Sequence, residues 1–355
     1  MGKAVRWTPE ALDKVQAAIL ADPKGIDGVA ARMNLARKSI ENALRHHRRP
    51  LVWQEKPYEV PEMVIERPAP PDMPIKELVD YRIRLFERRQ AYEEDRHLIT
   101  VRVRESLPVG ILHFGDPHLD DDGTDLALLK EHAELVRDTP GLYGANVGDS
   151  TNNWIGRLAR LHSEQHTTAA DGWRLAEWFT ELVGSKWLYI VAGNHDLWSG
   201  AGNPMKWISA RVNALHEESN VRIALRFPNK SVVRVNCRHD FKGSSQYNPA
   251  HGPMKALFFG VRDHIAIAGH RHESAYGVLK DPESAITMHA IRVASYKVYD
   301  RYARESQFRD QHLGPACVTV IDPRLPAEHP DLVKVFWDPH IGAEYLGWLR
   351  KRKVA

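Results

Sequence analysis

The sequence predicts an α/β protein with a small all-α module at its amino end. From Val101 to about Asp196, apolar strand-like runs alternate with helical patterns, which is typical of a layered sheet with helices on its faces. Strand-like runs dominate afterwards, at 221–227, 232–237, 286–293 and 318–321. The change from alternation to consecutive strands indicates a two-sheet sandwich with outer helices, which we place at residues 98–342.

Three short helices are expected within residues 1–49. Thr8 is an N-cap candidate followed by proline at the first helical position, and apolar residues then recur on one face to residue 20. Further helices fit 27–33 and 36–47, and the stretch 29–45 resembles a helix-turn-helix. We expect this module to bind DNA, and the alternative is a basic bundle that binds protein or only solvates its charges. The predicted DNA-binding residues are Arg37, Lys38, Asn42, Arg45, Arg48 and Arg49.

A spacer and a long helix are expected to follow the module. Residues 50–74 are rich in proline, which cannot sustain a helix and favours an extended linker. Residues 75–97 predict an amphipathic helix, whose apolar positions are Leu78, Tyr81, Leu85 and Tyr92. We expect this helix to pack on the following domain, and pairing with a second copy in a homodimer is the alternative.

Composition narrows the classes of function. The net charge of +3 and the pI near 8.7 permit nucleic-acid binding without requiring it. Two cysteines cannot form a disulfide framework, the start lacks the apolar core of a signal peptide, and no apolar run approaches the roughly 20 residues that span a bilayer. We therefore expect a cytoplasmic protein with no membrane contact. Residues 343–355 carry clustered cations and predict a basic tail.

Four short polar blocks each follow an apolar run. They are Gly115-Asp116-Pro117-His118, Gly148-Asp149, Gly193-Asn194-His195-Asp196 and Gly269-His270-Arg271-His272. The runs before them, at 109–114, 143–147, 187–192 and 264–268, predict buried strands, so the blocks lie at carboxyl ends of strands, where α/β proteins place their active sites. The mixed carboxylate, amide and imidazole donors are too many for one metal ion and suit two.

The blocks resemble, in order and type, the signature of the calcineurin-like metallophosphoesterase superfamily. The resemblance covers roughly residues 105–325 and implies a four-layer α/β/β/α sandwich. The GNHD form ending in Asp196 is similar to the branch typified by the Mre11 and SbcD nucleases, and the arginine that phosphoprotein phosphatases carry after the GD block is absent. The whole arrangement also resembles phosphoesterases of tailed bacteriophages and prophages, which implies the cytoplasm of a bacterial host.

The resemblance implies a site for two divalent cations. Manganese is the expected metal, and iron, zinc and nickel accept similar ligands. The implied ligands are Asp116, His118 and His272 for one cation, Asn194, His239 and His270 for the other, and Asp149 as the bridge. His239 is selected because it follows the strand 232–237; His251, in a loop context, and His216, in a helix context, are the alternatives.

The resemblance also implies catalytic and substrate-binding residues. His195 would contact the phosphate and protonate the leaving oxygen, and Asp196 would orient His195 or support its loop. Asn152 and Asn153 follow the GD block where the family usually has an acidic residue, and together with Arg271 they are substrate-contact candidates.

Three other segments have alternative interpretations. The acids Asp120, Asp121 and Asp122 are expected to cap the next helix, or otherwise to tune the site. Residues 154–178 and the run from Tyr296 to Arg304 mix aromatic and basic side chains, which suits either nucleic-acid contact or ordinary core and solvated positions.

These expectations combine into a binuclear metal-dependent phosphodiesterase. The first hypothesis is a DNA nuclease that hydrolyses phosphodiester bonds by in-line attack of a metal-bridging hydroxide. A second is a phosphoesterase for nucleotides, cyclic nucleotides or other small phosphoesters. A third is a non-catalytic DNA-binding factor, against which the full set of metal-ligand types argues.

Overall fold

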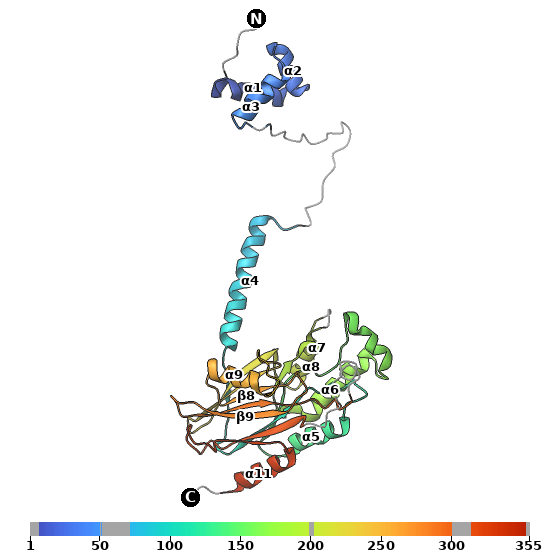
Figure 1. Ribbon diagram of the computed structural model, residues 1–355, viewed down its shortest axis with the longest axis vertical. Helices are drawn as coiled ribbons and strands as arrows, with labels where there is room; N and C mark the ends of the chain where they lie inside the picture. The colour runs from blue at the N-terminus through green and yellow to red at the C-terminus, as the bar shows by residue number, and fades with distance from the viewer. Residues whose placement is uncertain (1–6, 50, 52–71, 199–201, 300–313, 353–355) are drawn as a thin grey trace. The chain divides into compact units, whose positions relative to one another are not determined.

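The computed structural model describes residues 7–49, 51, 72–198, 202–299 and 314–352 (Figure 1). The chain divides into two compact units between Leu78 and Val79, inside helix α4 (Ile75–Arg96). Most of the predicted spacer, the cations Arg301 and Arg304 with Tyr302, and the last three residues of the predicted tail lie outside the described residues.

The first unit contains three helices close to the predicted ranges: α1 (Pro9–Ala21), α2 (Gly25–Met33) and α3 (Arg37–His46). The Thr8 hydroxyl accepts a hydrogen bond from the Ala11 backbone N–H (3.3 Å), as expected for an N-cap. Leu12 and Ile19 of α1, Val29 of α2 and Ile40 of α3 are buried and belong to one small core shared by the three helices. Asn34 ends α2 in the left-handed conformation, at φ +50°, so that a short turn leads into α3.

The second unit is built on two six-stranded sheets. The first has the order β1 (Ile99–Arg102), β6 (Asn220–Arg226), β7 (Val232–Arg238), β8 (Ile265–Ala268), β10 (Thr287–Arg292) and β9 (Ala275–Lys280). The second has the order β12 (Val333–Phe336), β11 (Ala316–Ile321), β2 (Val109–Phe114), β3 (Leu142–Asn146), β4 (Trp187–Ala192) and β5 (Leu215–Glu218). The strands predicted from apolar runs are thus present, with ends shifted by two residues at most.

The two sheets pack face to face and carry helices on their outer faces. Inward side chains such as Ile111, Val191, Ile223 and Ile267 form a continuous apolar core between the sheets. Four helices cover the outer face of the β2 sheet: α5 (Leu126–Asp138), α6 (Ala169–Val183), α8 (Pro204–Arg211) and α11 (Pro339–Lys351). Helix α9 (His251–Phe259) packs on the opposite sheet (Figure 1). The predicted four-layer α/β/β/α sandwich is confirmed.

Strand direction determines where the polar blocks meet. Strands β2, β3, β4 and β5 are mutually parallel, and β7, β8 and β10 are parallel in the other sheet. The carboxyl ends of the parallel strands in each sheet therefore lie at one edge, and the four blocks follow β2, β3, β4 and β8 there.

The carboxyl-terminal residues differ from the predicted basic tail. Residues 343–351 belong to α11, whose Ala343, Leu346 and Leu349 are buried against the β2 sheet. The cations Arg350 and Lys351 lie in its last turn, where positive charge is favourable because the carbonyl groups there are unpaired. Ala343, Leu346 and Leu349 recur at the i, i+3 and i+6 spacing of a helix face, but the prediction followed the neighbouring cluster of basic residues instead.

Helix α4 also differs from expectation. None of its residues is buried, and Leu78, Val79, Ile83 and Phe86 are each at least 40 % exposed, so most of the helix does not pack on the sandwich. Contact is made near its end, where Arg96 pairs with Glu217 of β5 (2.7 Å). No described helix is both long and apolar enough to cross a membrane.

Candidate metal centre

The seven predicted metal ligands lie together at the carboxyl ends of five strands. Asp116 and His118 follow β2, Asp149 follows β3, Asn194 begins the short helix α7 (Asn194–Leu197) after β4, His239 follows β7, and His270 and His272 follow β8. The alternative histidines lie elsewhere: His216 is in β5, not a helix, and bonds to Asn203 (3.0 Å), and His251 begins α9.

Asp116, His118 and His272 form the first group. One ligand atom from each lies within 4.8 Å of the others, and His272 Nε2 is 3.4 Å from Asp116 Oδ2. Asp116 and His118 are almost completely buried, whereas His272 is half-buried, so the group opens to solvent on one side.

Asp149, His239 and His270 form the second group, with Asn194 beside them. His239 Nε2 lies 2.9 Å from Asn194 Oδ1, 3.1 Å from Asp149 Oδ2 and 3.1 Å from His270 Nδ1. One ligand atom each from Asp149, His239 and His270 lies within 4.8 Å of the others, which is an arrangement that can surround a cation, and Asn194 Oδ1 lies beside His239.

Asp149 lies between the two groups. Its Oδ2 is 3.9 Å from His118 Nε2 and 3.1 Å from His239 Nε2. Its Oδ1 accepts a hydrogen bond from the His195 backbone N–H (3.0 Å), which fixes the carboxylate in this position. One carboxylate thus faces both groups at once.

Hydrogen bonding directs the ring of His239 toward the site. Its Nδ1 lies 3.1 Å from the Val147 carbonyl oxygen, which can only accept, so Nδ1 carries the proton and Nε2 faces the other ligands. Burial alone would lower the pKa of His239, but Asp149 and Asp116 outweigh burial and raise it to about 10. Conversely, burial opposes ionisation of Asp149, but the neighbouring histidines, His239 first, lower the pKa of its carboxyl.

The backbone of the ligand loops is strained. His118, Asp149, His270 and His272 have φ values of +41°, +51°, +69° and +52°, in the left-handed region that side chains other than glycine disfavour. Such strain gathers at functional sites, where the surrounding structure imposes it.

Glycines before three of the ligand positions allow close approach between loops. A Cβ on Gly148 would lie 2.4 Å from His239 Nδ1, one on Gly193 would lie 2.1 Å from Asp149 Oδ1, and one on Gly269 would lie 2.3 Å from Asp116 Oδ1. These three glycines are therefore required by packing around the side chains of Asp116, Asp149 and His239.

The site fits divalent cations. Within the described residues, Asp116 Oδ1 and both ring nitrogens of His118 are buried and have no hydrogen-bond partner. Unsatisfied buried polar atoms are costly, and a cation would supply the missing partner. Burial, followed by the neighbouring His195, lowers the pKa of His118 well below its usual value, so its imidazole is neutral and able to bind metal.

His195 lies beside the two groups with one ring nitrogen directed at them. Its Nδ1 bonds to the Asn152 carbonyl oxygen, and its Nε2 is 4.0 Å from Asp149 Oδ2. The ring packs against Trp154 and Trp198, at centroid distances of 5.1 and 4.1 Å. Because a carbonyl only accepts, Nδ1 keeps its proton and Nε2 is the atom free to exchange one.

Asp196 lies beneath the site and does not orient the His195 ring. Its carboxylate is fully buried and accepts hydrogen bonds from the backbone N–H groups of Ser150 (3.0 Å) and Gly193 (2.9 Å). It therefore joins two ligand loops and is a positioning residue, which matches the second of the two roles expected for it, support of the His195 loop. Burial and the charge of Asp149 raise its pKa to about 7.

Asn152 differs from its prediction as a substrate contact. It is fully buried, and its amide donates to Asp121 Oδ2 (2.8 Å). Asn153 is half-buried, and its amide donates to the His195 carbonyl oxygen (2.7 Å). The Asn152 side chain thus anchors its own loop to Asp121, and the Asn153 side chain holds the His195 loop. The sequence could not show which way either side chain points.

The acidic residues that follow the first ligand pair hold the loop of Asn152 in place by hydrogen bonds and do not cap a helix. Asp125 is the residue that caps α5, through the Leu128 N–H (3.0 Å). Asp120 accepts from the Asn152 backbone N–H (2.7 Å), and Asp121 pairs with the buried Lys297 (3.0 Å). The alternative that these acids shape the site is therefore the better description.

Arg292, at the end of β10, is a supporting residue that sequence reasoning missed. It is completely buried, donates to the Gly269 carbonyl oxygen and pairs with Asp240 (2.8 Å). Asp240 also lies 3.4 Å from the half-buried guanidinium of Arg271, which therefore sits at the rim of the site. In the sequence, the one indication of this role is that Arg292 places a charge at the end of a mostly apolar strand.

Comparison with known proteins finds similarity only among solved structures. No family model matches the sequence, and no curated protein matches it. Vps29 of Chaetomium thermophilum is 13 % identical with a TM-score of 0.34, over 59 % of this chain and 81 % of Vps29. The NAD nucleotidase NadN of Haemophilus influenzae is 10 % identical with a TM-score of 0.34, over 64 % of this chain and 49 % of NadN, about half its length. Because these identities and TM-scores are low, the chemistry of the site is inferred from its own side chains and not from these two proteins.

Proposed function

We propose that this chain is a binuclear metal-dependent phosphodiesterase that cleaves DNA. The observation that carries the proposal is the position of Asp149, whose single carboxylate faces two clusters of metal-ligand side chains. A carboxylate shared by two such clusters is suited to a pair of divalent cations.

In this proposal Asp116, His118 and His272 hold one cation, Asn194, His239 and His270 hold the other, and Asp149 contacts both. Manganese is the expected metal, because oxygen and imidazole ligands suit it. Two bound cations would lower the pKa of water and neutralise charge on the phosphoryl oxygens.

His195 supplies the proton for the leaving oxygen. The Asn152 carbonyl oxygen holds the Nδ1 proton, so a second proton at Nε2 faces the site and can be donated. Trp154 and Trp198 restrict the ring to this orientation. Arg271, at the rim, is positioned to meet a phosphate of the substrate.

The amino-terminal unit would bring the enzyme to DNA through its turn and third helix. Lys38, Asn42, Arg45 and Arg48 are exposed, and no ion-pair partner is found for these cations in the described part of the chain. Arg37 pairs with Asp27 and Glu41, and the half-buried Arg49 pairs with Asp13, so these two predicted contacts are less available.

Incubation with Mn²⁺ and a substrate panel tests the proposal. The panel contains single-stranded DNA, duplex DNA, bis(4-nitrophenyl) phosphate and 4-nitrophenyl phosphate, and EDTA provides the blank. We expect cleavage of DNA and of the diester, because both present a phosphodiester to the site. Hydrolysis of the monoester or of free nucleotides with intact DNA would instead identify a small-phosphoester enzyme.

A further inference from the structure

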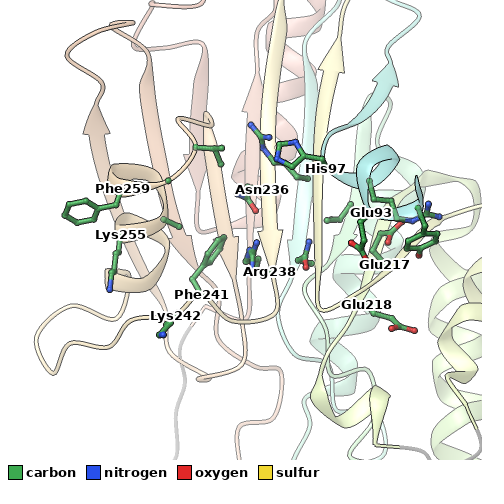
Figure 2. Close-up of a pocket in the computed structure, with 18 of the residues that line it drawn as sticks. Glu93, His97, Glu217, Glu218, Asn236, Arg238, Phe241, Lys242, Lys255 and Phe259 are labelled. Atoms are coloured by element: carbon green, nitrogen blue, oxygen red, sulfur yellow. The ribbon is translucent and has the colours of Figure 1, made fainter. Parts of the chain in front are cut away.

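A large groove lies on the outer face of the β7 sheet, between the end of α4 and helix α9 (Figure 2). Its volume is about 1020 Å³, at the upper limit of the roughly 300 to 1,000 Å³ typical of small-molecule sites. Asn236 and Arg238 form part of its floor, because the alternate residues of β7, Val235 and Cys237, point into the core between the sheets. We name it the outer groove.

The unpaired charge of the outer groove is strongly positive. Lys206, Arg238, Lys242 and Lys255 line it, are exposed, and have no ion-pair partner among the described residues. Glu93 and Glu217, by contrast, pair with Arg89 and Arg96, which leaves Glu218 as the one lining acid without a partner in the described chain. Four unpaired cations against one unpaired acid favour a polyanion.

Exposed aromatic rings accompany these cations. Phe259 is 78 % exposed at the α9 side, and Tyr92 is 40 % exposed at the α4 side, with the Arg96 guanidinium 3.5 Å from its ring centroid. Cations that contact phosphates and aromatic faces on which bases stack are the two features of sites for single-stranded nucleic acid. A duplex keeps its bases stacked on one another and could not use these rings.

We propose that the outer groove binds a single-stranded nucleic acid and leads it toward the metal centre. Two consecutive residues at the end of β7 connect the outer groove to the metal centre: Arg238 lines the groove, and His239 lies among the metal-ligand side chains. Phe241 and Lys242, which follow them, continue the groove wall (Figure 2). The direction of travel rests on the proposed function, whereas binding itself does not.

Binding of a fluorescein-labelled 30-mer oligothymidylate to the full chain in EDTA tests the proposal without hydrolysis. The variants are the double substitution Lys242→Ala with Lys255→Ala, and Phe259→Ala. The matched controls are Lys280→Ala on β9 and Tyr247→Ala, both exposed and neither lining the groove. All substituted side chains are exposed, and unchanged thermal unfolding confirms that each variant is folded.

We expect the double variant to reduce the slope of log affinity against log salt by about 0.7 for each phosphate that the protein no longer neutralises. Phe259→Ala should weaken binding by about fivefold or more, as loss of one stacked base does, and both controls should match the parent chain. Unchanged affinity and salt slope in the groove variants would overturn the proposal, as would equal losses for single strand and duplex. Hydrolysis of bis(4-nitrophenyl) phosphate is measured separately with Mn²⁺, and the groove variants should hydrolyse it as fast as the parent chain. If the parent chain does not hydrolyse this diester, the proposed function is wrong, but the proposal that the groove binds nucleic acid still stands or falls on the binding data.

Discussion

Small residues next to the ligands determine whether the candidate metal centre can form. The Gly193 Cα lies where a side chain would meet Asp149, and Gly269 has the same relation to Asp116. Both carboxylates also accept backbone N–H groups from the neighbouring loops, at 3.0 Å from His195 and 2.6 Å from His270. The carboxylates are therefore oriented before any cation arrives.

Replacement of Gly193 by Ala should weaken metal binding, because the added Cβ would lie 2.1 Å from Asp149 Oδ1. The other close atoms belong to the backbone and to the same carboxyl group, so the clash is relieved only if the Asp149 carboxylate moves out of position. We expect at least a tenfold loss of Mn²⁺ affinity by calorimetric titration. Gly347→Ala on α11 is the control, since nothing lies within 4 Å of its added Cβ, and there alanine favours the helix by about 0.5 to 1 kcal/mol. Equal Mn²⁺ affinity in both variants would show that Asp149 is not a ligand.

Replacement of His195 by Ala should slow hydrolysis by about 10² to 10⁴-fold, the usual contribution of a positioned acid or base. The loss should be larger for DNA than for bis(4-nitrophenyl) phosphate, because nitrophenolate leaves without protonation. Manganese content should not change. Loss of one metal equivalent would make His195 a ligand, which its distance of 4.0 Å from Asp149 allows.

The strand before each of the four blocks indicated that their side chains gather at carboxyl ends of strands, and the resemblance implied the ligand set. His239, which lies outside the blocks, was selected only from its place after the strand 232–237. The contacts of single side chains were not predictable in this way. Asn152 turns inward to Asp121, and Arg292 reaches the Gly269 loop from a strand remote in sequence. Both contacts depend on tertiary packing that no local pattern encodes.

At the scale of elements, strands and helices of the sandwich bury several neutral histidines away from the metal centre. Burial lowers the pKa of His113 on β2 to about 3, and those of His132 on α5, His264 before β8 and His289 on β10 to about 4. His113 bonds to Thr319 (3.0 Å) and His289 to Tyr276 (2.6 Å), so their neutral rings are integrated into the sheets.

These histidines should make the sandwich unstable in acid. Their folded pKa values lie below the unfolded value near 6.5, so the stability they contribute is present above pH 6.5 and is lost as the pH falls toward 4. A tenfold difference between the folded and unfolded acid dissociation constants corresponds to about 1.4 kcal/mol of unfolding free energy. Calorimetry at pH 5 in buffers of different ionisation enthalpy should show uptake of several protons on unfolding, and His289→Gln should remove about one. Uptake near zero in the parent chain would contradict this account.

Regular elements were predicted where the local pattern and the tertiary packing agree. The strands and α1 to α3 show such agreement. Helix α11 did not, because its buried Leu346 and Leu349 are interspersed with exposed polar and basic residues. For α4 the pattern showed a helix but not what covers it, since amphipathic spacing identifies a face and not its partner.

At the scale of the whole molecule, the chain combines a helical unit with a sandwich that holds every candidate metal ligand. The division falls between Leu78 and Val79, and the first unit has its own apolar core. The two units should therefore contribute separately to binding and to chemistry.

Deletion of residues 1–50 tests this division of labour. We expect weaker affinity for duplex DNA and a salt slope reduced by about 0.9 for each phosphate that the protein no longer neutralises, because the deletion removes Lys38, Arg45 and Arg48. Turnover of bis(4-nitrophenyl) phosphate should be nearly unchanged, since all candidate ligands lie after residue 115. If duplex affinity and salt slope do not change, the helices serve another partner.

The central claim is that Asp149 joins two cations in one hydrolytic site, and the Asp149→Asn variant tests it most directly. The parent chain should bind two Mn²⁺ ions in equilibrium dialysis and hydrolyse bis(4-nitrophenyl) phosphate. His270→Ala, at an exposed position, serves as the companion variant for the second cation. Both variants should keep the circular dichroism spectrum of the parent chain but lose hydrolysis, and Asp149→Asn should bind fewer than two ions. Substantial turnover by folded Asp149→Asn would contradict the account.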